Sequence, residues 1–447
     1  MTEINDLSDS AKASSDKMEK IVSLCKRRGF VFPGSEIYGG LANSWDYGPL
    51  GVELKNNIKQ LWWKRFVTSR DDMVGIDAAL IMNPKVWEAS GHLSEFNDPL
   101  VECKNCHERY RADQIKLTDP CAKCGKKDWA DVKQFNMMFK TNLGPVADEK
   151  STVYFRPETA QAMFVQFKNV LDTTRKILPF GIAQVGKAFR NEITPGNFIF
   201  RTREFDLMEF EYFINPKDDW NKHFEYWLEQ MKGWLKDIGV TKNVEFVEIP
   251  DGERAHYSKR TVDIEYKYPF GQKELYGLAY RTDYDLKKHQ EKSGQSLEYT
   301  DPQTGEKFLP HVIEPAFGAD RSVLVALLEA YTEEGEGDGR RVYLKLPPKL
   351  APFKVAVFPL LKNKPELVEK ARGIYHELQK SFNVAWDERG NVGKRYYSQD
   401  EIGTPYCITV DFQSLDDQTV TVRDRDTKEQ PRVKIEELSG YISQKLI

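Results

Sequence analysis

Residues 189–205 have the sequence FRNEITPGNFIFRTREF, and this stretch decides the fold that we expect for the chain. Its centre, TPGN at 194–197, combines residues that favour tight turns, and strand-like apolar runs flank it at 180–190 and 200–213. Two such runs separated by a turn of this composition are typical of a β-hairpin. The sequence therefore predicts an antiparallel pair of strands joined at residues 194–197.

Charged side chains lie at the turn end of this predicted hairpin. Arg190 and Glu192 share one face of the first strand, because side chains two residues apart project to the same side. Arg203, Phe205 and Glu209 share one face of the second strand. Such a face can hold a nucleotide, with arginine on phosphate, phenylalanine on the base and glutamate on its amino edge. From this pattern alone, the alternative is a ladder of cross-strand ion pairs on a solvated sheet.

Two further segments favour the nucleotide. At 313–321 (IEPAFGADR) a turn of small residues precedes a predicted helix with an arginine at its start, and RPETAQ at 156–161 places a carboxylate at another helix start. The sequence contains no GxxxxGK[ST], GxGxxG, HExxH or GxSxG motif that would compete for the chemistry. A nucleotide bound without a glycine-rich phosphate loop argues against P-loop and Rossmann sites.

Two CxxC pairs, Cys103/Cys106 and Cys121/Cys124, are separated by 14 residues. Each pair can place two thiolates on one metal ion, and together they complete a tetrahedral four-cysteine site of the structural zinc type. Because protein would supply all four ligands, the metal would have no open position for catalysis. The alternative is four unligated thiols in a loop.

Length and composition limit the kinds of protein that this chain can be. A chain of 447 residues is longer than a single hydrophobic core usually accommodates, so two or three domains are expected. No apolar run approaches the roughly 18 residues of a membrane span, and the N-terminus lacks the pattern of a signal peptide. Paired cysteines in a long chain favour a reducing compartment, so we expect a cytoplasmic protein without membrane contact. The net charge of −4 means that an RNA-binding role requires a locally positive surface.

The longer strings of the sequence allow a family to be recognised. FRNE (189–192) with the later Phe205 resembles motif 2 of class II aminoacyl-tRNA synthetases, GADR (318–321) resembles motif 3, and GPLG (48–51) resembles motif 1. Nearly the whole chain from residue 18 onward is similar to the dimeric type of glycyl-tRNA synthetase. The strings that carry this resemblance are YGGLANSWDYGPLGVELKNN (38–57), MNPKVWEASGH (82–92), RPETAQ, FRNEITPGNFIFRTREF, GTPYCITVDF (403–412) and TVTVRDRD (419–426).

The resemblance implies an α+β fold in which an antiparallel class II sheet is flanked by helices. It also implies attachment of glycine to tRNA(Gly) at the expense of ATP, through a glycyl-adenylate, with Mg²⁺, a structural Zn²⁺ and a homodimeric state. A Gly/Glu run at 333–339 predicts a linker before a C-terminal α/β domain. The expected parts are a disordered tail (1–17), a class II catalytic domain (18–345) with a zinc-binding insertion (101–128) and a helical insertion (215–260), and an anticodon-binding domain (346–447).

The family's ATP-binding residues can be carried over to matching positions. Arg190 would hold the α-phosphate, Arg321 the γ-phosphate, and Glu274 would face ATP and Mg²⁺; these three are the expected catalytic residues. Phe205 would stack on adenine and Glu192 would bind its amino group. The resemblance completes the ATP-binding set with Asn191, Phe200, Arg201, Arg203, Leu275, Gly318 and Asp320.

The resemblance also implies a glycine pocket. Three glutamates would surround the ammonium group and leave no room for a substituent at Cα, which suits the smallest amino acid. One position departs from the family, which usually has serine where this chain has Ala316; a lost hydroxyl contact would weaken glycine binding by about 1 kcal/mol. The expected glycine-binding residues are Arg111, Glu158, Glu209, Arg281, Glu314, Ala316 and Gly318.

Two alternatives remain open from the sequence. The first is another class IIa synthetase, such as a threonyl, prolyl or histidyl enzyme, against which RPETAQ and the three glutamates argue. The second is a non-catalytic synthetase-like subunit that binds nucleic acid, against which Arg190 and Arg321 argue. In the C-terminal domain KRYY (394–397) mixes cations and rings as binding of a single-stranded loop requires, although a solvated helix start has the same composition.

Overall fold

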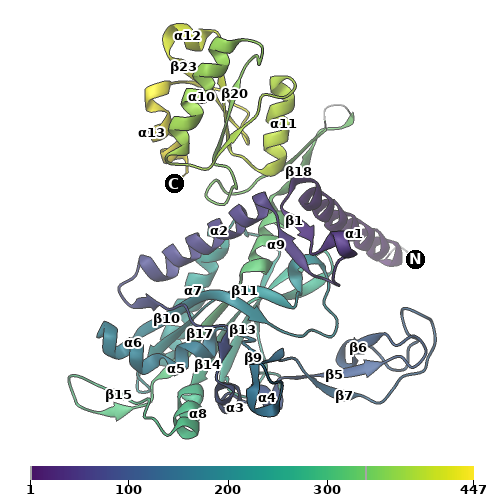
Figure 1. Cartoon of the computed structure of the whole chain (residues 1–447), viewed down its shortest axis with the longest axis vertical. Coiled ribbons are helices and arrows are strands. Elements are labelled where there is room, and N and C mark those ends of the chain that lie inside the picture. Colours follow the sequence, from purple (N-terminus) through teal and green to yellow (C-terminus); the bar gives the residue numbers. More distant parts are fainter. Residues whose placement is uncertain (1–2, 338–339, 447) are drawn as a thin grey trace.

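The computed structural model describes residues 3–337 and 340–446. Figure 1 shows a large body around a central sheet, a smaller C-terminal domain, and an arm formed by β5 (Asn97–Glu102), β6 (Arg109–Arg111) and β7 (Lys133–Asn136) that projects from the body. Within the part of the chain that the structure describes, no helix is long and apolar enough to cross a membrane.

A seven-stranded sheet forms the centre of the large body. The hairpin predicted from residues 189–205 is confirmed, since its two strands pair in antiparallel register from Phe180 opposite Phe213 to Phe189 opposite Glu204. Neighbouring strands are antiparallel throughout, except for β3, which pairs in parallel with β10 at one edge. In sheet order the strands are β12 (Val244–Glu248), β13 (Arg260–Tyr268), β14 (Gly271–Thr282), β17 (His311–Gly318), β11 (Glu204–Ile214), β10 (Phe180–Phe189) and β3 (Met73–Gly75).

Helices cover both faces of this sheet. On one face Trp227 of α7 packs against Phe210, and on the other Phe164 of α5 packs against Phe213. Phe210 and Phe213 are an odd number of residues apart on β11, so they project to opposite faces. The helices of the first face are α2 (Pro49–Trp63), α7 (Trp220–Asp237) and α9 (Ala319–Ala330), and those of the second are α5 (Ala160–Val165), α6 (Phe167–Thr174) and α8 (Tyr284–Ser293).

The segment 215–260 is only partly helical. The helix of this segment, α7, buries an aromatic stripe that includes Trp227 and Trp234. The predicted helical insertion also contributes a strand, because Val244–Glu248 forms the edge strand β12 of the central sheet. Its alternating side chains are mostly exposed, so they carry little of the apolar signal by which a strand is recognised.

The N-terminal segment differs from its prediction. A disordered tail was expected over residues 1–17, yet one helix, α1, extends from Glu3 to Arg28. Ile21, Leu24 and Cys25 are buried and fix its C-terminal half. No proline or glycine interrupts residues 3–17, and extending an anchored helix costs far less than nucleating a new one. Residues 1 and 2 lie outside the described part of the chain.

The first two residues of the predicted linker belong to a β-ribbon. β18 (Tyr331–Glu334) pairs antiparallel with β19 (Arg341–Leu344), and residues 338–339 of the predicted linker lie outside the described chain. The side chain of Arg341, in this ribbon, donates a hydrogen bond to Asp400 of α11 (Val392–Ile402). Arg423 donates to both oxygens of the same carboxylate. The ribbon is therefore joined to the C-terminal domain by buried ion pairs.

The C-terminal domain has the predicted α/β alternation. Its five strands follow the order β21 (Val384–Trp386), β20 (Val355–Pro359), β22 (Tyr406–Val410), β23 (Thr419–Asp424) and β24 (Arg432–Lys434), with α10 (Pro365–Gln379), α11, α12 (Gln413–Asp417) and α13 (Leu438–Lys445). Arg395 of the KRYY segment is buried and donates hydrogen bonds to four main-chain carbonyls, so it holds the fold instead of presenting a cation. Lys394 and Tyr397 are not buried.

Candidate active site

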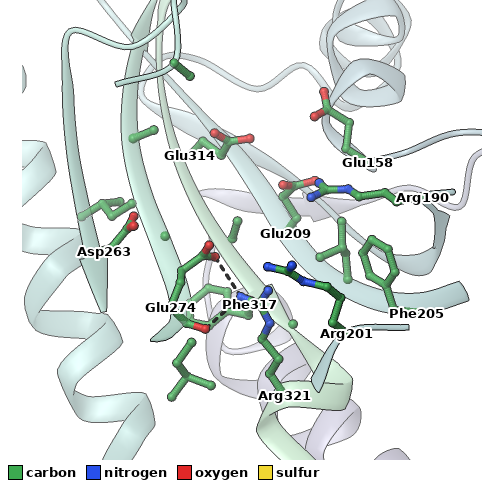
Figure 2. A pocket seen from close by; sticks show the side chains of 18 of the residues that line it. Glu158, Arg190, Arg201, Phe205, Glu209, Asp263, Glu274, Glu314, Phe317 and Arg321 are labelled. Carbon is green, nitrogen blue, oxygen red and sulfur yellow. Dashed lines mark hydrogen bonds and ion pairs between the residues drawn. The ribbon is translucent and has the colours of Figure 1, made fainter. Parts of the chain in front are cut away.

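A cavity of about 490 Å³ lies on the sheet face that α5 and α8 cover. Its floor is made by alternate residues of three adjacent strands, as the two-residue period of a strand requires. Figure 2 shows Glu158, Glu209 and Glu314 at one end of the cavity, Arg201 and Arg321 with Glu274 at the other, and Arg190 beside Glu209. The floor residues are Phe205, Leu207 and Glu209 of β11, Leu275, Gly277 and Ala279 of β14, and Glu314, Ala316 and Gly318 of β17.

The arginine end is formed around Arg321, which lies in the first turn of α9. Its Nη1 lies 3.2 Å from Oε1 of Glu274 and donates to the Glu274 main-chain carbonyl at 2.9 Å. The guanidinium also lies over the ring of Phe200, 4.6 Å from its centroid. Arg201 points into the same space (Figure 2). This end can therefore bind an anion, once Glu274 is neutralised or displaced.

Arg190 and Phe205 lie side by side in the middle of the cavity. The Arg190 guanidinium carbon is 5.4 Å from the centroid of the Phe205 ring and 5.4 Å from that of Phe96. Arg190 Nε donates to the Pro157 carbonyl at 3.1 Å, which fixes the direction of the side chain. Oε2 of Glu192 is buried without a hydrogen-bond partner among the described residues. A flat ring, an oriented cation and an unsatisfied acceptor suit a base with an amino group.

The carboxylate end contains Glu158, Glu209 and Glu314. Burial opposes ionisation of Glu158, yet His92, Arg281 and Gln161 together hold its pKa well below the usual range. Burial and the neighbouring Glu158 raise the pKa of Glu209. Burial, Glu209 and Glu158 raise the pKa of Glu314 to about 8, although Arg281 opposes the rise. This end therefore carries more carboxylates than the protein can neutralise, as a cation-binding pocket would.

A buried network orients these glutamates from behind. Arg281 Nη1 donates to both oxygens of Glu314 at 2.9 Å, and Arg281 also donates two hydrogen bonds to Asp285. Gln161 bridges Asp285 and Glu158. Glu314 and Glu158 are thus held by partners whose own side chains are fixed, which limits their movement when the cavity is empty.

Asp320 couples three segments of the predicted motifs. One oxygen accepts from Tyr47 at 2.5 Å and from Lys55 at 2.7 Å, and the other accepts from the Asp206 main-chain nitrogen at 2.7 Å. Lys55 of α2 also pairs with the buried Asp206 carboxylate. Asp320 lines the cavity, but its hydrogen bonds to the protein give it a positioning role.

The structure brings most of the predicted residues together, but four do not line the cavity. Arg111 pairs with Asp98 at 2.7 Å in the arm, and Arg281 lies behind Glu314. Arg203 donates to the main-chain carbonyls of Ala42 and Glu192, while Asn191 follows β10 in a loop bonded to Met137. Arg190 and Glu192 also lie beyond the end of β10, so their placement on a strand face was wrong. The predicted residues that line the cavity are Glu158, Arg190, Glu192, Phe200, Arg201, Phe205, Glu209, Glu274, Leu275, Glu314, Ala316, Gly318, Asp320 and Arg321.

Sequence reasoning missed Asp263 and Glu211. Asp263 of β13 lines the cavity, and burial with the nearby Glu274 and Glu265 raises its pKa to about 7. Glu211 of β11 lies beside Glu209 and Glu314. Glu211 could have been found from the sequence, because it lies two residues beyond Glu209 on the same strand and so projects to the same face.

The four cysteines of the two CxxC pairs meet beyond the outer end of β5, away from the body. Sγ of Cys103 lies 3.6 Å from that of Cys124, and Sγ of Cys106 lies 3.7 Å from that of Cys121. These separations are too long for disulfides, whose S–S bond is about 2.05 Å. Tetrahedral zinc–sulfur bonds of about 2.3 Å would place the sulfurs about 3.8 Å apart. The cluster could therefore hold zinc.

Comparisons with known proteins agree with this architecture. Residues 139–331 match the tRNA synthetase class II core domain (G, H, P, S and T), and residues 354–445 match the anticodon binding domain. The glycine–tRNA ligase of Clostridium acetobutylicum is 54% identical to this chain, over 96% of the chain and 98% of the relative. The chain belongs to the glycine–tRNA ligase family. The glycine–tRNA ligases of Caldanaerobacter subterraneus and Geobacillus thermodenitrificans are 52% and 53% identical, each over 96% of this chain.

Membership of the glycine–tRNA ligase family confirms the resemblance on which the fold was predicted. It also confirms the predicted fold class, a class II core followed by an anticodon-binding domain. The alternative of a threonyl, prolyl or histidyl enzyme is therefore wrong. The residue roles carried over from the family remain predictions.

Proposed function

We propose that this cavity catalyses the glycine–tRNA ligase reaction, with ATP at the arginine end and the glycine ammonium group at the carboxylate end. The observation that carries the proposal is the division of a single cavity between the buried Glu158, Glu209 and Glu314 on one side and Arg201 and Arg321 on the other, with Arg190 between them (Figure 2). An amino acid and a nucleoside triphosphate have complementary charges to these two ends. Their reacting groups, a carboxylate and the α-phosphate, would meet between them.

In the first step a glycine carboxylate oxygen attacks the α-phosphorus of ATP, and pyrophosphate leaves with the bonding electron pair. In the second step a hydroxyl at the 3′ end of tRNA attacks the glycyl carbonyl, AMP leaves with the bonding electron pair on its phosphate oxygen, and the hydroxyl proton passes to that phosphate or to solvent. Arg190, oriented by Pro157, would stabilise the charge that develops on the α-phosphate. The first step requires positioning and charge neutralisation, and no protein nucleophile.

The adenine moiety would lie against Phe205, beside the Arg190 guanidinium. Oε2 of Glu192, which lies 4.0 Å from Nε of Arg201 but has no hydrogen-bond partner among the described residues, would accept a hydrogen bond from the exocyclic amino group. An amino group satisfies this acceptor and a carbonyl does not, so the site would favour adenine over guanine at that position.

A magnesium ion fits the arginine end. Glu274 offers a half-exposed carboxylate, and Asp263 lines the same cavity. Oxygen ligands supplemented by water and phosphate are those that Mg²⁺ prefers. When bound, the ion would neutralise the polyphosphate.

Selectivity for glycine would come from the crowding of carboxylates around the ammonium group. A pocket that excludes substituents at Cα rejects every competitor, because all other amino acids are larger. Ala316, opposite Glu209 in the sheet register, replaces the usual serine and leaves one hydroxyl contact unmade.

The remaining parts have supporting roles. A zinc ion held by the four cysteines would stabilise the arm, and the C-terminal domain would bind the anticodon region of tRNA(Gly). The exposed side chains Ile37, Tyr38 and Leu41, which are 88%, 85% and 68% accessible, precede the motif 1 helix and would be covered in a homodimer. Light scattering tests this state. A cytoplasmic location follows from a role in translation.

The test is amino-acid-dependent exchange between ATP and pyrophosphate, with each of the twenty amino acids supplied in turn. Exchange with glycine alone would support both the reaction and its selectivity. Exchange with another amino acid would overturn the assignment of the carboxylate pocket. Absence of exchange together with retained tRNA binding would favour the non-catalytic alternative.

A further inference from the structure

A fourth glutamate, Glu211, lies beside Glu209 and Glu314 at the carboxylate end of the cavity. It is completely buried, and neither of its carboxylate oxygens has a hydrogen-bond partner among the described residues. It does not line the cavity itself. Such a group is costly to bury, so its presence beside a functional pocket requires a physical explanation.

The sheet register places Glu211 against two other carboxylates. The register that pairs Glu209 with Ala316 and Tyr212 with Ile313 sets Glu211 directly opposite Glu314. Glu209, two residues earlier on β11, projects to the same face. One carboxylate oxygen from each of these three glutamates lies within 4.8 Å of the other two. Like charges opposite each other repel even on an exposed sheet, and the repulsion is larger in a buried one.

The surrounding cations do not compensate for this charge. The guanidinium of Arg281 is committed to Glu314 and Asp285, and it donates no hydrogen bond to Glu211. Burial, followed by the charge of Glu314, raises the pKa of Glu211 far above its usual range. The titratable and charged groups that face Glu211 are Glu209 from β11, Glu314 from β17, Arg281 from β14 and Asp285 from α8, with Glu158 beyond Glu209 at the start of α5.

We propose that one proton resides on either Glu211 or Glu314, without a hydrogen bond between the two carboxylates, while the pocket is empty, and that the ammonium group of glycine displaces this proton on binding. This inference rests on the proposed function, since it requires the ammonium group to enter the carboxylate end. The arriving positive charge lowers the proton affinity of the pair, and the released proton passes to the solvent. Glu211 is thus a positioning residue that acts through Glu314.

Proton release links the affinity for glycine to pH. If binding releases one proton, the affinity rises by up to about tenfold for each pH unit below the pKa of the empty pair, and it levels off above that pKa. If binding released no proton, the affinity for glycine would not change with pH in this way.

The experiment is calorimetric titration of the full-length protein with a non-hydrolysable glycyl-adenylate analogue. Measurements at pH 7 in two buffers of different ionisation enthalpy give the number of protons released. The acetyl-adenylate analogue, which lacks the amino group, is the matched ligand and accounts for protons exchanged at the nucleotide end. We expect release of about 0.5 to 1 proton with the glycyl analogue beyond that of the acetyl analogue.

Glu211→Gln tests the assignment to this residue. It preserves the shape of the side chain but removes its titration, so the extra proton release should fall to near zero and the pH dependence of the glycine KM should flatten. Glu377→Gln, an exposed substitution on α10, is the control and should leave both unchanged. Thermal unfolding of each variant establishes that it is folded.

Each outcome has a definite meaning. Binding of the glycyl analogue without extra proton release in the parent protein overturns this inference and leaves the proposed function intact. Undiminished release from Glu211→Gln overturns the assignment of the proton to this pair. Failure of the parent to bind either analogue overturns the proposed function, and the inference with it. If Glu211→Gln does not fold, the comparison of the two analogues in the parent decides.

Discussion

Arg321 and Glu274 neutralise each other at the arginine end of the cavity, with the Arg321 Nη1 3.2 Å from the Glu274 carboxylate and 2.9 Å from the Glu274 main-chain oxygen. Both residues have predicted partners in ATP: a phosphate for the arginine and a magnesium ion for the glutamate. Binding of the magnesium–ATP complex would therefore replace one internal ion pair with two intermolecular ones. The pair keeps Arg321 oriented in the absence of ATP.

Substitution of Glu274 tests this exchange of partners. In Glu274→Gln the arginine loses its carboxylate partner and the metal loses a charged ligand. We expect the KM for ATP to stay within about threefold of the parent value while kcat of ATP–pyrophosphate exchange falls about 100-fold, a loss of about 2.7 kcal/mol in the transition state. Equal losses in KM and kcat would contradict the assigned role.

Arg190→Ala tests the cation assigned to the α-phosphate. Removal of one oriented donor at the reacting centre is expected to lower kcat of glycine activation by about 100- to 1000-fold. Binding of tRNA, measured by filter retention, should remain because the C-terminal domain is distant in the structure. Arg389→Ala is the matched control for glycine activation, since this arginine is 92% exposed in its side chain and belongs to the C-terminal domain. Near-normal activation by Arg190→Ala would refute the assignment.

Ala316→Ser restores the hydroxyl that is usual in the family. Its position opposite Glu209 places the new group at the carboxylate end of the cavity. One additional hydrogen bond of about 1 kcal/mol would lower the KM for glycine about fivefold. The KM for ATP serves as the internal control and should not change. An unchanged or raised glycine KM would show that the serine contact is not available in this pocket.

Lys55→Met tests the buried pairs that join α2 to the start of α9. Burial opposes ionisation of Asp206, but Lys55, Lys59 and Lys187 lower its pKa to about 2. Without Lys55, the buried carboxylates of Asp206 and Asp320 lose their closest cation, and the free energy of unfolding in urea should fall by about 3 kcal/mol at pH 7. Lys380→Met, which removes an exposed pair with Glu377, should change it by less than about 0.5 kcal/mol.

The same variant should show a characteristic pH dependence. A carboxylate whose pKa is depressed in the folded state contributes stability above its unfolded pKa of about 3.9, and this contribution is lost as pH falls toward 2. The difference in stability between the parent and Lys55→Met should therefore shrink between pH 4 and pH 2. A constant difference over that interval would mean that the lysine stabilises through packing and not through charge.

Cys121→Ser tests the four-cysteine cluster. We expect the zinc content, measured by plasma mass spectrometry, to fall from about one ion per chain to near zero. Hydrogen exchange should then accelerate in β5, β6 and β7, because the metal would supply the stability of this small sheet. Cys25→Ser, a buried thiol outside the cluster, is the control for zinc content. Equal metal content in Cys121→Ser and the parent would refute the site.

The hairpin was predictable because its signals are local. The turn at 194–197 and the apolar runs beside it determine the pairing of β10 with β11. Phe205 and Glu209 lie an even number of residues apart on β11, so their side chains project to the same face of the sheet. The two CxxC pairs were predictable for the same reason, since their spacing is visible in the sequence. The resemblance to a family supplied the rest of the predicted site, including residues on strands that are distant in sequence.

Burial and tertiary pairing account for what the sequence did not reveal. No local pattern shows that Glu211 faces Glu314, because that relation depends on the register between β11 and β17. Arg281 carries the same charge whether it lines a cavity or lies behind it, and only packing places it beneath Glu314. The extension of α1 depends similarly on burial of Ile21 and Leu24, which the polar composition of the preceding segment conceals.

The ion pairs around Asp400 hold the C-terminal domain against the β-ribbon that leads to it from the large body. This carboxylate is fully buried and serves both Arg341 of the ribbon and Arg423 of the C-terminal sheet. Pulling the two domains apart would strand buried charges at a cost of several kcal/mol. These ion pairs therefore resist any change in the separation between the cavity and the surface that would bind the anticodon. A tRNA bound to both the cavity and the C-terminal domain would therefore meet two sites at a nearly constant separation.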